Sequence, residues 1–153
     1  MYIEPAAYDA ILASIVNYPA YSAPWNTDRI FFVEDFESDI PSGTIHMGLC
    51  PLVAVRGGVS DDFTQVAGDL FEGTLEFEIL VAVSRPLVYT RADWNVIQEF
   101  TGDIERAVDS IDAPGFKMKP QTSKGNPVSL KGMETRVLTL TIDASECRGV
   151  PVT

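Results

Sequence analysis

The chain has 153 residues, of which 46% are hydrophobic and 22% charged, proportions typical of a packed globular protein and not of a disordered one. This length fits a single domain spanning residues 1–153, which can bury about 70% of the surface that the unfolded chain exposes. The 22 acidic residues outnumber the 11 basic ones, and the net charge of −11 disfavours direct binding to nucleic acid or to an anionic membrane. No stretch approaches the roughly 18 apolar residues of a membrane span, so we expect no membrane insertion.

The first part of the chain predicts a helix and a strand on either side of an irregular segment. Apolar residues recur at helical spacing over 5–17, which predicts an amphipathic helix. Residues 20–48 contain prolines and glycines around an apolar group at 30–33, so we expect a loop with a short strand or turn inside it. The β-prone run 51–56 begins at a proline and stops at a Gly-Gly pair, which predicts a strand.

The second part predicts two strands, a helix and two long loops. An acidic loop over 61–72 is followed by strict alternation over 74–84, typical of a long strand with one buried face. A capping pattern and apolar spacings of three, four and seven predict a helix over 91–110. Prolines and glycines make 113–133 a loop, and 134–143 alternates as a last strand. We therefore expect an α+β fold, an antiparallel sheet with two helices on one face and long loops that form contacts between subunits.

Charge is distributed unevenly along this chain. Residues 1–80 hold 13 of the 22 acidic residues and only two arginines, whereas 113–133 holds four lysines and no acid. Such asymmetry suits self-association or docking, although charged loops also serve simply to keep a protein soluble. We interpret the two charged loops as docking contacts with a second subunit or another partner, formed by Asp61, Asp62, Asp69, Glu72, Lys117, Lys119, Lys124 and Lys131.

Residues that carry out catalysis or hold cofactors are sparse. His46 is the single histidine, and no Gly-x-Ser-x-Gly elbow accompanies it, so a hydrolytic triad is not indicated. No glycine-rich loop precedes a Lys-Ser or Lys-Thr pair at the spacing of a phosphate-binding loop. Cys50 and Cys147 each stand alone, which excludes a Cys-x-x-Cys redox motif or a zinc cluster. We therefore expect no enzyme activity, no cofactor and no metal.

The acidic segment 34–39 resembles the start of a calcium-binding loop. With Asp35 as the first ligand, Ile40 occupies the sixth position, where the loop needs glycine, and His46 occupies the twelfth, where it needs glutamate. The EF-hand interpretation therefore fails. A looser cation site stays open beside a solvated acidic segment and a docking or channel surface, and we favour the last two. The acids concerned are Glu34, Asp35, Glu37 and Asp39.

The order of the predicted elements resembles that of the tail-terminator (lambda-type minor tail protein U) family of long-tailed bacteriophages. The resemblance covers most of the chain in element order, although its motifs are short. The 20–48 segment and the basic loop 113–133 depart from the family pattern. The elements that carry the resemblance are an N-terminal helix, the strand Pro51-Leu52-Val53-Ala54-Val55, the acidic loop from Asp61 to Glu72, the alternating strand from Leu75 to Val83, a helix and the strand from Arg136 to Ile142.

The resemblance implies a structural protein of the virion. Members of this family are small α+β subunits that form a hexameric ring on the head-proximal end of the tail tube, stop its polymerisation and present a surface to neck or head-closure proteins. They assemble in the host cytoplasm, and DNA passes through the ring without specific binding. A ring needs one patch of a subunit to meet a different patch of its neighbour, and acidic and basic loops would supply that pairing.

Two other functions stay open. The nearer one is another neck component, such as a head-closure or tail-completion protein, which shares the small size, the acidity and the ring-forming habit. The more distant one is a small cytoplasmic enzyme or ligand-binding α+β domain, which needs a pocket with convergent polar groups. The sequence indicates no such set of residues.

Overall fold

The computed structural model describes most of the chain. Nine stretches are described: 3–17, 29–36, 51–57, 63–84, 91–111, 116, 120–128, 130 and 132–147.

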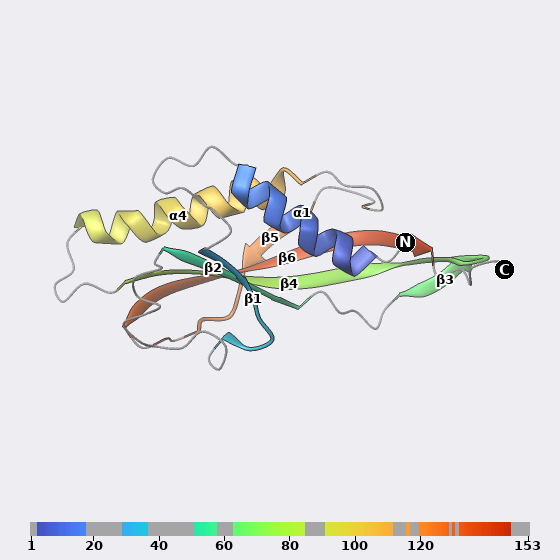
Figure 1. Cartoon of the computed structure of the whole chain (residues 1–153), viewed down its shortest axis with the longest axis horizontal. Helices are drawn as coiled ribbons and strands as arrows, with labels where there is room; N and C mark the ends of the chain where they lie inside the picture. Colours follow the sequence, from blue (N-terminus) through green and yellow to red (C-terminus); the bar gives the residue numbers. More distant parts are fainter. Residues whose placement is uncertain are drawn as a thin grey trace.

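Within these residues the protein has an α+β fold, with two helices packed against one face of a six-stranded sheet (Figure 1). The strand order is β1-β2-β4-β6-β5, and β3 pairs with β4 beside this path. The predicted fold class is confirmed. In chain order the elements are α1 (Ile3–Asn17), β1 (Ile30–Phe32), β2 (Leu52–Gly57), β3 (Thr64–Ala67), β4 (Leu70–Ser84), α4 (Arg91–Asp109), β5 (Gln121–Lys124) and β6 (Met133–Cys147).

The antiparallel pair of β4 and β6 is the centre of the sheet. The two strands stay in register along their whole lengths, from Leu70 opposite Cys147 to Ser84 opposite Met133. Strand β2 pairs antiparallel with the other side of β4, over Leu52–Gly57. Strand β1 pairs with β2 in parallel, so the prediction of a purely antiparallel sheet is wrong at this edge. The long connection between the two strands allows the crossover that parallel pairing requires.

The predicted acidic loop 61–72 is wrong over its described part. Residues 64–67 form β3, and Leu70 already begins β4, with a tight turn at Gly68 and Asp69 between the two strands. Gly68 has a φ of +54°, a backbone conformation that glycine adopts without the steric cost of a Cβ. Asp69 is exposed in the turn of this hairpin, so an acidic side chain here is compatible with paired strands.

The long loop predicted over 113–133 also contains a strand. Residues Gln121–Lys124 pair with β6 as β5, and the peptide N–H of Gly125 then donates to the carbonyl of Val137. All four side chains of β5 are polar, so hydrophobic alternation could not reveal it. Strand β6 is longer than predicted at its C-terminal end, because pairing with β4 continues to Cys147.

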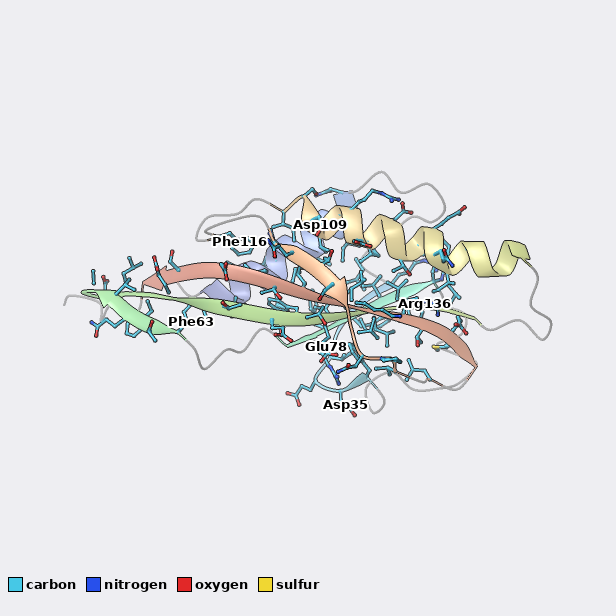
Figure 2. All side chains as sticks on the ribbon, turned by 180° about the vertical axis from the view of Figure 1, so that it is seen from behind. Asp35, Phe63, Glu78, Asp109, Phe116 and Arg136 are labelled. Atoms are coloured by element: carbon cyan, nitrogen blue, oxygen red, sulfur yellow. The ribbon has the colours of Figure 1, made fainter. Side chains whose placement is uncertain are left out.

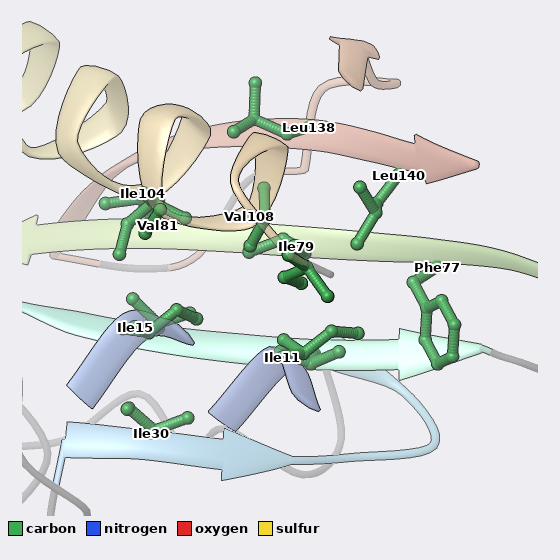
Figure 3. Close-up of a cluster of buried hydrophobic side chains, with 14 of the residues drawn as sticks. Ile11, Ile15, Ile30, Phe77, Ile79, Val81, Ile104, Val108, Leu138 and Leu140 are labelled. Atoms are coloured by element: carbon green, nitrogen blue, oxygen red, sulfur yellow. The ribbon is translucent and has the colours of Figure 1, made fainter. Parts of the chain in front are cut away.

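The main core lies between the helices and the sheet (Figure 3). Alternate residues of β4, including Phe77, Ile79 and Val81, point toward the helices and are fully buried. Burying a side chain of this size contributes about 1.5–3 kcal/mol, so this layer supplies most of the stability. The helix and sheet residues that meet here include Ile11, Ile15, Ile104, Val108, Leu138 and Leu140.

A second, smaller core covers part of the opposite sheet face. Phe36 is fully buried there against Leu52 and Leu80, and Met133 and Val137 of β6 join them. The prediction that β4 has one buried face is therefore wrong at this end, where Leu80 is buried as completely as its neighbours that face the helices. The residues that cover this face include Phe36 and Leu130, which belong to segments predicted as loops.

Tyr8 attaches α1 to the sheet at the edge of the main core. Its ring makes edge-to-face contacts with Phe32, at 5.1 Å between ring centroids, and with Phe77, at 5.2 Å. Its hydroxyl donates to the carbonyl of Gly57 at the end of β2. Tyr8 thus makes both apolar contacts and a hydrogen bond to the sheet, and together these position α1 on the sheet.

Candidate interaction surface

The part of the sheet that neither core covers is polar and acidic. Because Leu75, Phe77 and Ile79 point toward the helices, the residues that alternate with them on β4 point to the opposite face. Thr74 is paired with Asp143 of β6 in the register, and its hydroxyl donates to a carboxylate oxygen of that residue at 3.0 Å. We call this region the open face; its β4 and β6 members are Glu72, Thr74, Glu76, Glu78, Thr139, Thr141 and Asp143.

Arg56 of β2 stands at the border between the open face and the second core. Its Nη2 and Nε atoms lie 3.0 and 3.1 Å from one oxygen of Glu78, and Nη1 lies 3.5 Å from Asp35. The guanidinium also stacks 4.3 Å above the centre of the Phe36 ring. Figure 2 shows Asp35 and Glu78 on this side of the molecule. One cation thus neutralises acids from two segments and covers a buried aromatic ring.

Replacing Arg56 by lysine should lower the free energy of unfolding by about 1 kcal/mol, although the charge is kept. A lysine ammonium offers neither the two-nitrogen contact with Glu78 nor a planar group for the Phe36 ring. The change is measured by urea unfolding of both proteins. Arg136→Lys is the matched control, because the ion pair of Arg136 with Glu134 of its own strand uses one nitrogen. An ammonium can replace that contact, so this substitution should lower the free energy of unfolding by less than about 0.5 kcal/mol. Equal losses for the two variants would contradict the role given to stacking.

The structure places two of the four predicted acids of segment 34–39. Glu34 is exposed, and the side chain of Asp35 is 51% exposed while it pairs with Arg56. Glu37 and Asp39 lie outside the described residues, as does His46. Of these acids, Asp35 lies at the border of the open face, where Arg56 offsets its charge.

The predicted acidic and basic contact residues lie on opposite sides of the sheet where they are described. Asp69 is exposed in the β3–β4 turn, and Glu72 follows it on β4. Lys124 is exposed at the end of β5, beyond β6. A single chain therefore does not bring the two groups together. The remaining predicted contacts lie outside the described residues: Asp61, Asp62, Lys117, Lys119 and Lys131.

Sequence reasoning missed one buried charged residue. The side chain of Asp103 in α4 is 1% exposed, and its Oδ1 accepts a hydrogen bond of 2.9 Å from Arg106 one turn later. The other carboxylate oxygen accepts no hydrogen bond from the described residues. Nothing in the helix pattern distinguishes Asp103 from a solvent-facing acid, because it lies at the flank of the apolar stripe.

Hydroxyl and carboxylate groups connect β5 to α4. Thr122 lies opposite Leu140, so it points toward the helices, and its hydroxyl lies 3.1 Å from Asp109 and 3.5 Å from Glu105. This contact holds the edge strand against the helix layer. Figure 2 shows Asp109 near the start of β5.

The described residues contain no group of three or more histidine, cysteine or acidic side chains placed to hold a metal ion. Neither described helix is long and apolar enough to cross a membrane. Comparison with protein-family models and with curated proteins finds no match to this chain.

Proposed function

We propose that this protein is a structural subunit of a long-tailed bacteriophage, a tail terminator that forms a ring on the head-proximal end of the tail tube. The observation that carries the proposal is the element order on which the family resemblance rests. A helix, a strand beginning after Pro51, a long alternating strand, a second helix and a final strand follow one another in the chain. Strands β1, β3 and β5 add to this order, and the β3–β4 hairpin occupies the described part of the predicted acidic loop, so the resemblance is carried by the remaining elements.

The distribution of charge supports a ring through which DNA passes. The open face carries Glu72 and Glu76 of β4, beside the Glu78 that pairs with Arg56, and the whole chain has a net charge of −11. In the proposed ring this face borders the central channel. DNA gains affinity for a protein when cationic side chains release its counterions, and an acidic wall offers no such gain. DNA would therefore pass without being held.

The partners follow from the same proposal. One surface of the ring contacts the tube protein and stops further addition, and the other contacts a neck or head-closure protein. The subunits themselves join through a heterologous contact, in which different patches meet and the ring closes by rotation. Assembly takes place in the host cytoplasm, and the finished ring is part of the virion.

Electron microscopy of the purified protein, alone and mixed with isolated tail tubes, tests this function. We expect rings in the first sample and tubes capped at one end in the second, with further tube growth stopped. Gold labelling of whole virions should then place the protein between tail and head. A protein that labels the head alone would be another neck component. A monomer that ignores tubes and is absent from virions would contradict the proposal and favour a ligand-binding domain.

A further inference from the structure

Strands β1 and β5 end the strand order, and in the described part of the chain no strand pairs with the outer side of either one. Phe32 of β1 is 43% exposed, and three of the four residues of β5 are exposed. An end strand presents unpaired peptide N–H and C=O groups along its outer side, which makes it a template for pairing with another chain. The pairing on the inner side of each strand decides which residues carry those outward groups.

The outward backbone groups of β1 belong to Ile30 and Phe32. The peptide N–H of Val33, the residue after β1, donates to the carbonyl of Val55 in β2. Along a strand, residues whose N–H and C=O groups face the partner alternate with residues whose groups face away. Val33 therefore turns its groups toward β2, whereas Ile30 and Phe32 turn theirs outward. Both side chains lie on the helix side of the sheet, because Ile30 belongs to the main core and Phe32 contacts Tyr8 of α1 (Figure 3).

The outward backbone groups of β5 belong to Thr122 and Lys124. The peptide N–H of Gly125 donates to the carbonyl of Val137, a pair that continues the register of β5 with β6 by one residue. The same alternation then turns the groups of Lys124 and Thr122 away from β6. The side chain of Lys124 also lies on the helix side of the sheet, because it is opposite Leu138 of the main core. At both ends of the sheet, the residues with outward backbone groups are thus those on the helix side.

The two ends fit each other in register and in direction. Through β2, Phe32 is in register with Ile79 of β4. Through β6, Lys124 is in register with the same residue. Strands β1 and β5 run in opposite directions, because β1 is parallel to β2 and three antiparallel pairings separate β2 from β5. An antiparallel junction between two copies therefore places Phe32 opposite Lys124 without a shift along the strands, and it keeps both helix layers on one side.

The side chains at this level are complementary as well. Phe32 exposes part of an aromatic ring, and Lys124, the one charged residue of β5, is exposed. Directly opposite side chains of an antiparallel pair have Cβ atoms about 4.5–5.5 Å apart. At that separation the aliphatic stem of a lysine covers an aromatic ring, and its ammonium interacts with the ring face. The exposed Glu34, two residues after Phe32, has the opposite charge to this ammonium. A second copy of this chain is therefore the occupant that fits.

We propose that the outer side of β1 in one subunit pairs with the outer side of β5 in the next, with Phe32 opposite Lys124, so that the sheet continues from subunit to subunit. The contact is heterologous, as a ring requires, because two different strands meet. The helix layers of neighbouring subunits then lie on one side of the continued sheet, and their open faces lie on the other. This inference rests on the proposed ring and assigns its subunit contact.

Crosslinking between two single-cysteine variants tests this contact. Both variants carry Cys50→Ala and Cys147→Ser. One adds Phe32→Cys and the other Lys124→Cys, both at exposed positions. Mixed, with and without tail tubes, and treated with a short bis-maleimide, they should give a crosslinked dimer, and neither should do so alone. Val66→Cys on β3, at a position that is 50% exposed, is the matched control and should give no dimer with Lys124→Cys.

Each outcome of the crosslinking separates the contact from the function. A dimer from Phe32→Cys alone would indicate a two-fold contact between β1 strands and overturn the proposal, as would an equal yield from the Val66→Cys control. Rings or capped tubes with no crosslink would also overturn it, while leaving the terminator function intact. Crosslinked rings that do not cap tubes would support the contact and contradict the function. A chain that forms no oligomer, alone or on tubes, would overturn both.

A proline substitution supplies a second measurement with a matched control. Lys124→Pro removes a peptide N–H that faces outward and that the pairing of β5 with β6 does not use, so circular dichroism should show a folded chain. It should raise the protein concentration needed for half-assembly on the order of tenfold or more, measured by sedimentation velocity. Lys124→Ala keeps this N–H and loses only the side chain, and it should raise that concentration by about threefold. Equal effects of the two variants would contradict pairing through the backbone of β5.

Discussion

Replacing Phe77 by alanine should lower the free energy of unfolding by about 3–5 kcal/mol. Phe77 is fully buried in the centre of β4, facing the helices, and its ring contacts Tyr8 of α1. Alanine removes most of the apolar surface and leaves a cavity that the rigid strand pair β4–β6 cannot close. Urea unfolding followed by circular dichroism measures the loss.

Phe32 provides the control for this prediction. Its ring makes the same kind of edge-to-face contact with Tyr8, at 5.1 Å against 5.2 Å for Phe77, but it is 43% exposed at the sheet edge. Phe32→Ala therefore loses a similar aromatic contact without opening a closed cavity, and we expect a loss of about 1 kcal/mol. Similar losses for both variants would mean that the contact with Tyr8, and not burial, supplies the stability.

Gly57→Ala should lower the free energy of unfolding by about 2–4 kcal/mol. Gly57 ends β2 with a φ of +102°, a conformation that strains a residue with a Cβ. A Cβ at this position would lie 2.6 Å from the carbonyl oxygen of Glu76, a backbone atom of the neighbouring strand that cannot move freely. The substitution should also disturb the carbonyl of Gly57 that accepts the hydrogen bond from Tyr8.

Gly68→Ala separates the two causes of that loss. Gly68 also has a positive φ, at +54°, but a Cβ there meets no atom within 4 Å. Only the conformational cost applies, and we expect about 1 kcal/mol. Thermal or urea unfolding of both variants gives the difference, which measures the steric clash with β4. A Gly57→Ala protein as stable as Gly68→Ala would show that the strands separate easily at this point.

The long, strongly patterned elements could be predicted and the short polar ones could not. Helix α4 and strand β4 each have an apolar face maintained over many residues, so local periodicity was sufficient. Strand β5, with the sequence Gln-Thr-Ser-Lys, has no such face and exists because the edge of β6 is available for pairing. Strand β3 is equally exposed and depends on the tight turn that returns the chain along β4.

The candidate surface was likewise predictable only in part. Charge counting identified acids and bases in separate parts of the chain, and Asp69 and Lys124 are indeed exposed. The count could not place them on opposite edges of one sheet, nor show that Asp35 pairs with Arg56 over the ring of Phe36. Those relations join residues distant in sequence. They depend on strand order, which periodicity does not specify.

By itself, the sequence determined the α+β class, the two helices, the long strands and the excess of negative charge. These properties follow from local spacing and composition, because a helix or strand must turn its apolar side toward a core whatever its neighbours are. Tertiary structure alone decided that β1 pairs in parallel, that a second core buries Leu80 behind the sheet, and that β1 and β5 end the strand order while β3 pairs with β4 beside it. Pairing between distant strands sets these features, since the backbone groups that pair are the same in every residue and the sequence does not mark their partners.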